Sequence, residues 1–306
     1  MSAVAEWLAR EALPGRRVVH QEPLAGGYRN DNTLLVTDDG HRYVLRRYRN
    51  GAACVVESAL ARRLAGVVPV AAVVAADPDG YTSGEPVLLS RFMPGQLVST
   101  LLPGLASDDD AARLGEAVGD VLAAIGTFAF RGPGFLGPDL RPTAPEGMDL
   151  PTFLATCLAR RHPGHDWTDE ESARLVAVGE RYAAVLVAVA GARQLVHSDF
   201  NPKNLLAKRG PSGWVVTAVL DWEFAFSGSP LFDVGNMTRF AGDYPPSYVA
   251  GFLRGLRRSG GELPPDWREI SQGLDLYALA DLLTGPPSDV SRRAAARMRR
   301  LLTAAG

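Results

Sequence analysis

Acids and amides stand directly beside strand-like apolar runs in two segments of the chain, and this pattern constrains the fold more than any other feature. The segments are HSDFNPKNLL at 197–206 and VLDWEFAFSGSPLFDVGN at 219–236. Burying an unpaired polar group costs about 2–7 kcal/mol. Asp199, Asn204 and Asp221 must therefore have a chemical reason to lie next to buried strands.

Phosphoryl transfer supplies such a reason. The reaction needs an acceptor for the hydroxyl proton and oxygen ligands for a Mg²⁺ ion that bridges the phosphates. Residues 204–207 and 214–220 predict two strands joined by a turn at 208–213, and this hairpin would return Asp221 to the side of Asn204. The alternative is an ordinary hairpin with turn-forming Asp and Asn residues.

Both segments have counterparts in a known family. HSDFNPKN resembles the H-G-D-x-x-P-x-N catalytic loop of aminoglycoside phosphotransferases and their protein-kinase-like relatives, and DWEFAFSGSPLFDVG resembles the metal-binding segment that follows it. The first half of the chain has further parts in the matching order. The resemblance implies an α+β, two-lobed protein-kinase-like fold. Residues 1–92 would form a small antiparallel β-sheet lobe with one helix, and residues 93–306 a larger, mainly helical catalytic and substrate-binding lobe.

The resemblance also implies roles for the polar residues of the two segments. Asp199 would be the catalytic base, and Asn204 and Asp221 would bind Mg²⁺. His197 and Asp233 would be structural, the first orienting the catalytic loop and the second tethering it by hydrogen bonds.

In the first lobe, the resemblance implies a site for ATP or GTP. Arg46 takes the place of a phosphate-binding lysine, and Glu57 in the next helix takes the place of its ion-pair partner. Two short stretches would complete the site, one as the loop over the phosphates and one as the hinge that holds adenine. They are Gly26, Gly27 and Tyr28, and Ser90, Arg91 and Phe92.

The chain departs from the family pattern at several positions. Ser198 stands where glycine is usual, a change that adds a hydroxyl. Asn201 stands where protein kinases have lysine, which favours a small-molecule kinase over a protein kinase. Arg46 keeps the charge of the usual lysine on a planar guanidinium. A shift of the strand by one residue would put Arg47 in its place, but on the opposite face of the sheet.

Local patterns predict most of the other elements. Strands are expected at 18–24, 33–36, 43–46, 70–75 and 86–91, with a helix at 52–64 between the third and fourth. Ser107 predicts a helix start, and Thr168 with Glu171 predicts a capping box at the start of a later helix. Further helices are expected at 248–256, 270–283 and 290–302, and the proline-rich stretch 131–147 predicts a surface loop.

Composition narrows the class of protein. The chain has 306 residues, of which 46% are apolar and 22% charged, as in ordinary globular proteins. A net charge of −2 gives no reason to expect nucleic-acid binding. The N-terminal residues lack the features of a signal peptide, and no apolar stretch is long enough for a membrane span. We therefore expect a cytoplasmic protein that is a monomer or weak dimer, with Cys54 and Cys157 as buried thiols.

The substrate is less constrained by the sequence. Acids would steer a cationic antibiotic into the second lobe, and four of them are candidates for substrate binding: Glu223, Asp243, Asp275 and Asp281. Each is also consistent with an ordinary exposed charge or, for Glu223, a supporting role. The arginines at 292, 293, 297, 299 and 300 predict a basic C-terminal helix with a solvated face.

The expected function is transfer of the γ-phosphoryl group of ATP or GTP to a hydroxyl of an aminoglycoside-like or other antibiotic. A metabolic kinase acting on choline, a sugar or a homoserine-like alcohol is the alternative within the same chemistry. A nucleotide-binding pseudokinase without turnover is the alternative outside it.

Overall fold

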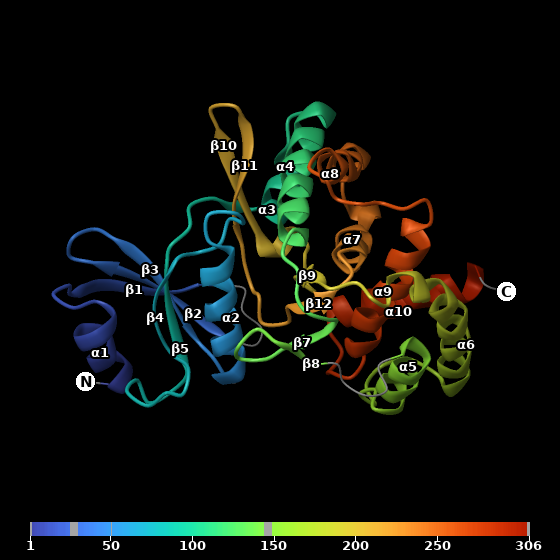
Figure 1. Cartoon of the computed structure of the whole chain (residues 1–306), viewed down its shortest axis with the longest axis horizontal. Helices are drawn as coiled ribbons and strands as arrows, with labels where there is room; N and C mark the ends of the chain where they lie inside the picture. The colour runs from blue at the N-terminus through green and yellow to red at the C-terminus, as the bar shows by residue number, and fades with distance from the viewer. Residues whose placement is uncertain (1, 25–29, 50, 144–148, 305–306) are drawn as a thin grey trace.

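The chain folds into a sheet lobe followed by a mainly helical lobe (Figure 1). The computed structural model describes residues 2–24, 30–49, 51–143 and 149–304. The predicted α+β, two-lobed protein-kinase-like fold is confirmed. The exact boundary between residues 92 and 93 stays a prediction.

The small lobe is a five-stranded antiparallel sheet in the order β1-β2-β3-β5-β4. Its strands are β1 (Val18–Leu24), β2 (Asp31–Thr37), β3 (Arg42–Arg47), β4 (Val73–Asp77) and β5 (Val87–Arg91). The predicted strands at 18–24, 33–36 and 43–46 are confirmed, and a tight turn at Gly40 joins the last two.

Each face of this sheet is covered by one helical element. On one face, Tyr43, Leu45 and Leu89 pack against α1 (Ala3–Trp7) and the π-helical turn Leu8–Ala12. On the other face, Leu88 packs with Cys54 of α2 (Gly51–Leu64). Since neighbouring residues of a strand point to opposite faces, Arg46 lies on the α2 side of the sheet.

The large lobe contains the remaining helices, with two small sheets. Its helices are α3 (Val98–Leu101), α4 (Asp108–Gly126), α5 (Leu150–Ala159), α6 (Asp169–Leu186), α7 (Leu231–Thr238), α8 (Pro246–Arg258), α9 (Trp267–Asp281) and α10 (Asp289–Ala304). Short 3-10 turns lie at Leu102–Gly104, Val187–Val189, Pro202–Asn204 and Ala241–Asp243. The Ser107 cap and the Thr168–Glu171 capping box are both present, as predicted.

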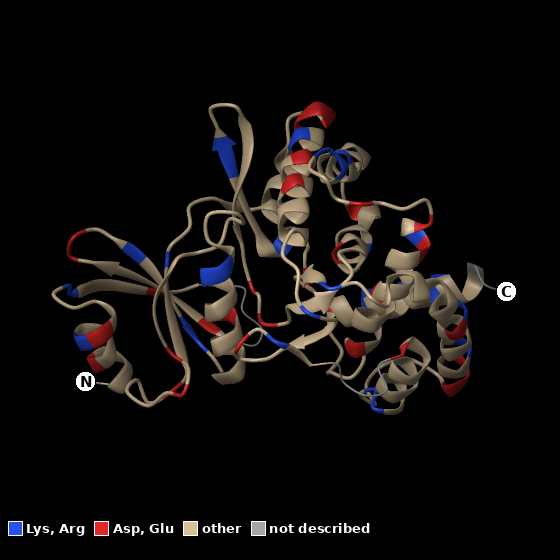
Figure 2. Ribbon diagram, in the orientation of Figure 1, with Lys and Arg blue, Asp and Glu red and all other residues tan. Residues whose placement is uncertain are grey.

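Helices α4 and α8 cross at very short range because each has a pair of glycines at the contact. A Cβ atom added at Gly115 or Gly119 would overlap the backbone of α8, and one added at Gly251 or Gly255 would overlap the backbone of α4. Acidic positions on α4 lie beside basic positions on α8 (Figure 2), where Glu116 pairs with arginines of α8.

The two small sheets hold the segments singled out by the sequence. One joins β6 (Gln96–Leu97) to the hairpin of β10 (Leu205–Gly210) and β11 (Gly213–Val219). The other runs β8 (Pro142–Thr143), β7 (Gly134–Leu136), β12 (Phe226–Gly228) and β9 (Gln194–Val196). The stretch 131–147, expected as a loop, therefore contains two short strands, β7 and β8. They pair with each other, and β7 also pairs with β12.

Within the described ranges, no helix combines the length and the apolar character that a membrane span requires.

Candidate active site

Strand β9 leads directly into the loop of His197, Ser198 and Asp199, and a buried carboxylate on α7 fixes this loop. Asp233 Oδ2 accepts the N–H of His197 at 2.8 Å, and Oδ1 accepts the N–H of Ser198 at 2.8 Å. Burial raises the pKa of Asp233 to about 7, against the opposing effect of these two hydrogen bonds. Asp233 thus holds the backbone of this loop by two hydrogen bonds.

The ring of His197 links the loop to the end of the hairpin. Its Nδ1 atom accepts the N–H of Asp199 at 3.2 Å, and its Nε2 atom lies 2.8 Å from the carbonyl oxygen of Leu220. Because a backbone N–H can only donate and a carbonyl can only accept, the proton sits on Nε2. The ring is fully buried, and burial lowers its pKa, in agreement with a neutral imidazole.

Ser198 adopts a left-handed backbone conformation, with φ at +77°. L-residues with a Cβ pay a steric penalty there, whereas glycine does not. The substitution of the usual glycine therefore changes backbone strain as well as adding a hydroxyl.

Two asparagines hold the carboxylate of Asp199. The Nδ2 atom of Asn201 donates to Oδ1 at 2.7 Å, and the Nδ2 atom of Asn204 donates to Oδ2 at 2.7 Å. Asn201 also caps the turn Pro202–Asn204 by accepting the N–H of Lys203. The carboxylate that the sequence nominates as a base is therefore oriented by both of its neighbours in the loop.

The hairpin returns to this loop as the sequence predicts. The N–H of Leu220 donates to the carbonyl of Asn204 at 2.8 Å, so Asp221 follows immediately beside Asn204. Asp221 has φ at +67°, a left-handed conformation that aspartate tolerates better than most residues. The three polar residues of the predicted site thus meet at the ends of one loop and one hairpin.

Arg46 of β3 reaches across from the small lobe to this group. Its Nη2 atom lies 2.5 Å from Asp221 Oδ1, and its Nη1 atom lies 3.5 Å from Glu57 Oε1. Burial alone would lower the pKa of Arg46, but Glu57, Tyr48 and Asp221 together hold it above its ordinary value. Arg47 instead pairs with Glu85, so the register puts Arg46 and not Arg47 at the site.

Glu57 is buried in α2 and has a second partner that the sequence did not indicate. The hydroxyl of Tyr48 donates to Glu57 Oε2 at 2.7 Å. Burial raises the pKa of Glu57, while Arg46 and Tyr48 oppose this effect. Tyr48 is the residue directly after β3, and nothing in its local sequence predicts the contact.

Glu223 belongs to the same group of charges. Its Oε2 atom lies 3.8 Å from Arg46 Nη2 and accepts the Nδ2 proton of Asn30 at 2.7 Å. Asn30 is buried and was not singled out by the sequence. Glu223 therefore lies on the side of the small lobe, together with Arg46.

The three residues predicted as a hinge lie at the end of β5 and just beyond it. The N–H groups of Arg91 and Phe92 donate to the carbonyls of Ala72 at 2.9 Å and Arg42 at 3.1 Å. Ser90 is buried between β3 and β4. An adenine held at this edge would thus need carbonyl oxygens of these residues or the backbone that follows them. Gly26, Gly27 and Tyr28 lie outside the described residues.

The donor set of the loop and hairpin suits Mg²⁺. Asn204 uses its Nδ2 protons on Asp199, which leaves its Oδ1 oxygen for another partner, and Asp221 uses only Oδ1 on Arg46. Mg²⁺ prefers a few protein oxygens and takes further ligands from phosphates and water. Among the described residues, His, Cys, Asp and Glu nowhere gather in a group of three or more that could hold a metal alone.

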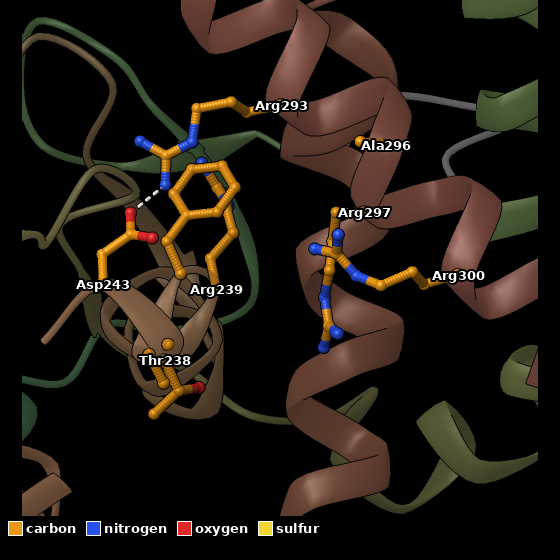
Figure 3. A pocket seen from close by; sticks show the side chains of 10 residues that line it. Thr238, Arg239, Asp243, Arg293, Ala296, Arg297 and Arg300 are labelled. Carbon is orange, nitrogen blue, oxygen red and sulfur yellow. Dashed lines mark hydrogen bonds and ion pairs between the residues drawn. The ribbon is translucent and has the colours of Figure 1, made fainter.

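The remaining substrate candidates are dispersed over the large lobe. Asp243 pairs with Arg293 of α10 and lines a cavity (Figure 3). Asp275 is buried in α9 and pairs with Arg239 at 2.6 Å. Asp281 ends α9 and is exposed. The structure brings none of the three into hydrogen-bonding contact with Asp199.

Comparisons with known proteins agree with this geometry. A family model described as the phosphotransferase enzyme family matches residues 20–271. A search of curated proteins finds no match.

Solved structures of similar fold cover almost the whole chain. A thermostable variant of aminoglycoside phosphotransferase APH(4)-Ia, in a ternary complex with AMP-PNP and hygromycin B, has a TM-score of 0.74 and 20% identity, covering 100% of this chain and 99% of that one. Macrolide 2'-phosphotransferase MphH from Brachybacterium faecium has a TM-score of 0.62 and 18% identity, covering 97% and 96%. The GDP and kanamycin complex of APH(2'')-IIIa has a TM-score of 0.67 and 14% identity, covering 96% of each chain.

At these identities the solved structures establish the fold, and the family model, which spans most of the sequence, establishes membership. The chain therefore belongs to the phosphotransferase enzyme family.

Proposed function

We propose that the protein transfers the γ-phosphoryl group of ATP or GTP to a hydroxyl group of a small molecule, with Asp199 as the acceptor of the hydroxyl proton. The observation that carries this proposal is the fixed carboxylate of Asp199. Asn201 and Asn204 each donate to one of its oxygens, and Asp233 tethers its loop. A base held in this way can take a proton from a substrate without first having to reorient.

Asn204 and Asp221 would hold Mg²⁺ through oxygens that make no hydrogen bond to Arg46 or Asp199. When bound, the ion would offset the charge that develops on the phosphates in the transition state. Arg46 is the cation nearest to this group and would contact a phosphate, with Glu57 and Tyr48 holding its guanidinium in position.

The nucleotide would lie between the lobes, along the end of β5 at Ser90, Arg91 and Phe92 and under the segment of Gly26, Gly27 and Tyr28. Structural neighbours with AMP-PNP and with GDP support a nucleotide at this kind of fold. They do not favour ATP over GTP for this chain.

Antibiotics are the first acceptors to test, because the neighbours are named aminoglycoside and macrolide phosphotransferases. A metabolic alcohol such as choline, a sugar or a homoserine-like compound fits the same chemistry. The complete set of Asp199, Asn204 and Asp221 argues against a pseudokinase module. Cytoplasmic location and a monomeric or weakly dimeric state remain part of the proposal.

The test measures nucleoside diphosphate release with a panel of hydroxyl acceptors, for wild type and for Asp199→Asn. The variant should retain binding of AMP-PNP with Mg²⁺ while turnover falls by about 10²–10⁴-fold, the contribution typical of a general base. Asp79→Asn, at an exposed aspartate of the small lobe, is the matched control and should keep wild-type turnover. Nucleotide binding without turnover of any acceptor by the wild type would favour the pseudokinase alternative.

A further inference from the structure

A cavity of about 590 Å³ opens between the end of α7 and helix α10 (Figure 3). One wall is the segment from Thr238 to Asp243, and the other is the face of α10 that carries Arg293, Arg297 and Arg300. Figure 3 shows these three arginines coming from one helix, opposite Arg239 and Asp243. Four arginines and a single carboxylate therefore line this cavity.

Two of the arginines are matched by acids. The side chain of Arg239 is 8% exposed, and its Nη2 and Nε atoms donate to Asp275 Oδ1 at 2.6 and 2.9 Å. Arg293 pairs with Asp243, and its guanidinium lies 3.9 Å from the centre of the Phe240 ring. These pairs use two of the four acids that the sequence suggested for attracting a cation, Asp275 and Asp243. These two acids are thus already paired with arginines of the protein itself.

The other two arginines, Arg297 and Arg300, form no ion pair with any residue that the structure describes. They are three residues apart on α10, a spacing that puts side chains on one face of a helix. Arg297 is half-buried and Arg300 is exposed. Their guanidinium groups give the cavity a net positive charge that no carboxylate of the described chain offsets.

The cavity is connected to the loop of Asp199 through α7. Asp233, near the start of this helix, binds the loop, and Arg239 follows its last residue. At a rise of about 1.5 Å per residue, the two ends of this stretch are about 9 Å apart. Asp199 is also close enough to contribute to the raised pKa of Arg239, whose main favourable partner is Asp275.

We propose that this cavity binds a carboxylate or phosphate group of the acceptor molecule, with Arg297 and Arg300 as its direct partners. The inference rests on the proposed function and specifies the acceptor as an anionic alcohol. Guanidinium groups suit both anions, since they donate parallel hydrogen bonds to paired oxygens. A polycation would meet repulsion at the same place.

The first experiment compares acceptors of different charge in the phosphoryl-transfer assay: gluconate and glucose 6-phosphate as anions, glucose as a neutral alcohol, and choline and kanamycin as cations. The anionic acceptors should have the highest kcat/KM, and the better of the two anions identifies carboxylate or phosphate. A neutral or cationic acceptor with the highest kcat/KM would overturn the inference and leave the proposed function standing. Absence of transfer to every acceptor would count against the proposed function instead.

The second experiment removes the two unmatched charges in the variant Arg297→Gln/Arg300→Gln. Its KM for the anionic acceptor should rise by about tenfold or more, the loss expected for charge-assisted hydrogen bonds, while KM for the nucleotide stays unchanged. Arg292→Gln is the control, because it removes the same charge from α10 at an exposed residue outside the cavity. Equal effects of the double variant and the control would contradict the assignment.

A binding measurement gives an outcome that does not depend on turnover. Citrate and inorganic phosphate are titrated by calorimetry into wild type saturated with AMP-PNP and Mg²⁺, so that the nucleotide site is filled. At least one of the two anions should bind to wild type and to Arg292→Gln, and its affinity should fall by about tenfold in the double variant. Unchanged binding in the double variant, or no binding of either anion to wild type, would overturn the proposal.

Discussion

Arg46 Nη2 lies 2.5 Å from Asp221 Oδ1, so a strand of the small lobe and the hairpin end of the large lobe are joined by an ion pair. The same guanidinium faces Glu57 at 3.5 Å and Glu223 at 3.8 Å. The guanidinium of Arg46 thus forms ion pairs with three carboxylates that come from different parts of the chain. A lysine at this position would offer a single compact charge in its place.

Arg46→Lys should therefore lower the free energy of unfolding by about 1–2 kcal/mol, because an ammonium cannot reach Glu57 and Asp221 in the same geometry. Urea denaturation measures the change. Arg47→Lys is the control: its pair with Glu85 is half-exposed, and the substitution should change stability by less than about 0.5 kcal/mol. Equal losses of unfolding free energy in the two variants would show that the contacts of the Arg46 guanidinium with Glu57 and Asp221 do not stabilise the protein.

Ser198→Gly should raise the free energy of unfolding by about 0.5–1 kcal/mol. Glycine removes the steric cost of the left-handed conformation, although its greater freedom in the unfolded chain offsets part of the gain. Ser198→Ala separates strain from the hydroxyl, because it keeps the Cβ atom and should leave stability within about 0.5 kcal/mol of wild type. Loss of stability in the glycine variant would exclude backbone strain at this position.

The contribution of Asp233 to the stability of the protein should fall as pH rises from about 4 to about 7. The pKa of this carboxyl is about 7 in the folded protein and 3.8 in its ordinary state. Folding therefore takes up a proton between these two values, and the free energy of unfolding decreases as pH passes through the window. Urea denaturation at pH 5 and pH 7.5 measures the slope for wild type and for Asp233→Asn.

The asparagine variant should be less stable than wild type by about 1–3 kcal/mol, since its NH₂ group cannot accept the backbone N–H that an oxygen of Asp233 now accepts. The difference in free energy of unfolding between wild type and Asp233→Asn should also become smaller as pH rises. A constant difference at pH 5 and pH 7.5 would mean that Asp233 does not titrate in this range.

Gly119→Ala should destabilise the protein by about 2–4 kcal/mol, because its Cβ would overlap Phe252 and Leu256 of α8 and force the helices apart. Gly126→Ala, at the last residue of the same helix, meets only ordinary contacts with Pro230 and should be neutral or stabilising by up to about 1 kcal/mol. Thermal and urea denaturation measure both. The two predicted effects differ by at least about 2 kcal/mol, so a general effect of alanine on α4 cannot produce them.

Local sequence patterns account for much of what could be predicted. Ser107 and the Thr168–Glu171 box cap their helices within one turn of chain, and the hairpin of β10 and β11 is closed by its own turn. The same holds for the loop at Asp199, whose two asparagines lie two and five residues away. Interactions between residues only a few positions apart can be predicted from the spacing of those residues in the sequence.

The ion pairs that set the charge of the proposed substrate region join residues that lie far apart in the sequence. Asp243 and Arg293 are 50 residues apart, and Asp275 and Arg239 are 36 apart. The acids alone suggest a region that attracts cations, whereas the tertiary fold matches Asp243 and Asp275 with an arginine each. Three of the five arginines of α10, which the sequence presents as a solvated face, line a cavity: Arg293, Arg297 and Arg300. Tyr48 and Asn30 were missed because nothing local indicates their carboxylate partners.

The ring of His197 links the proposed base to the proposed metal site. It contacts the residue proposed as the base at one nitrogen and the residue preceding the proposed metal carboxylate at the other. The separation between proton acceptor and metal ligand is therefore set entirely inside the large lobe. Rotation of the small lobe around a nucleotide would change the reach of Arg46 while this spacing stays constant.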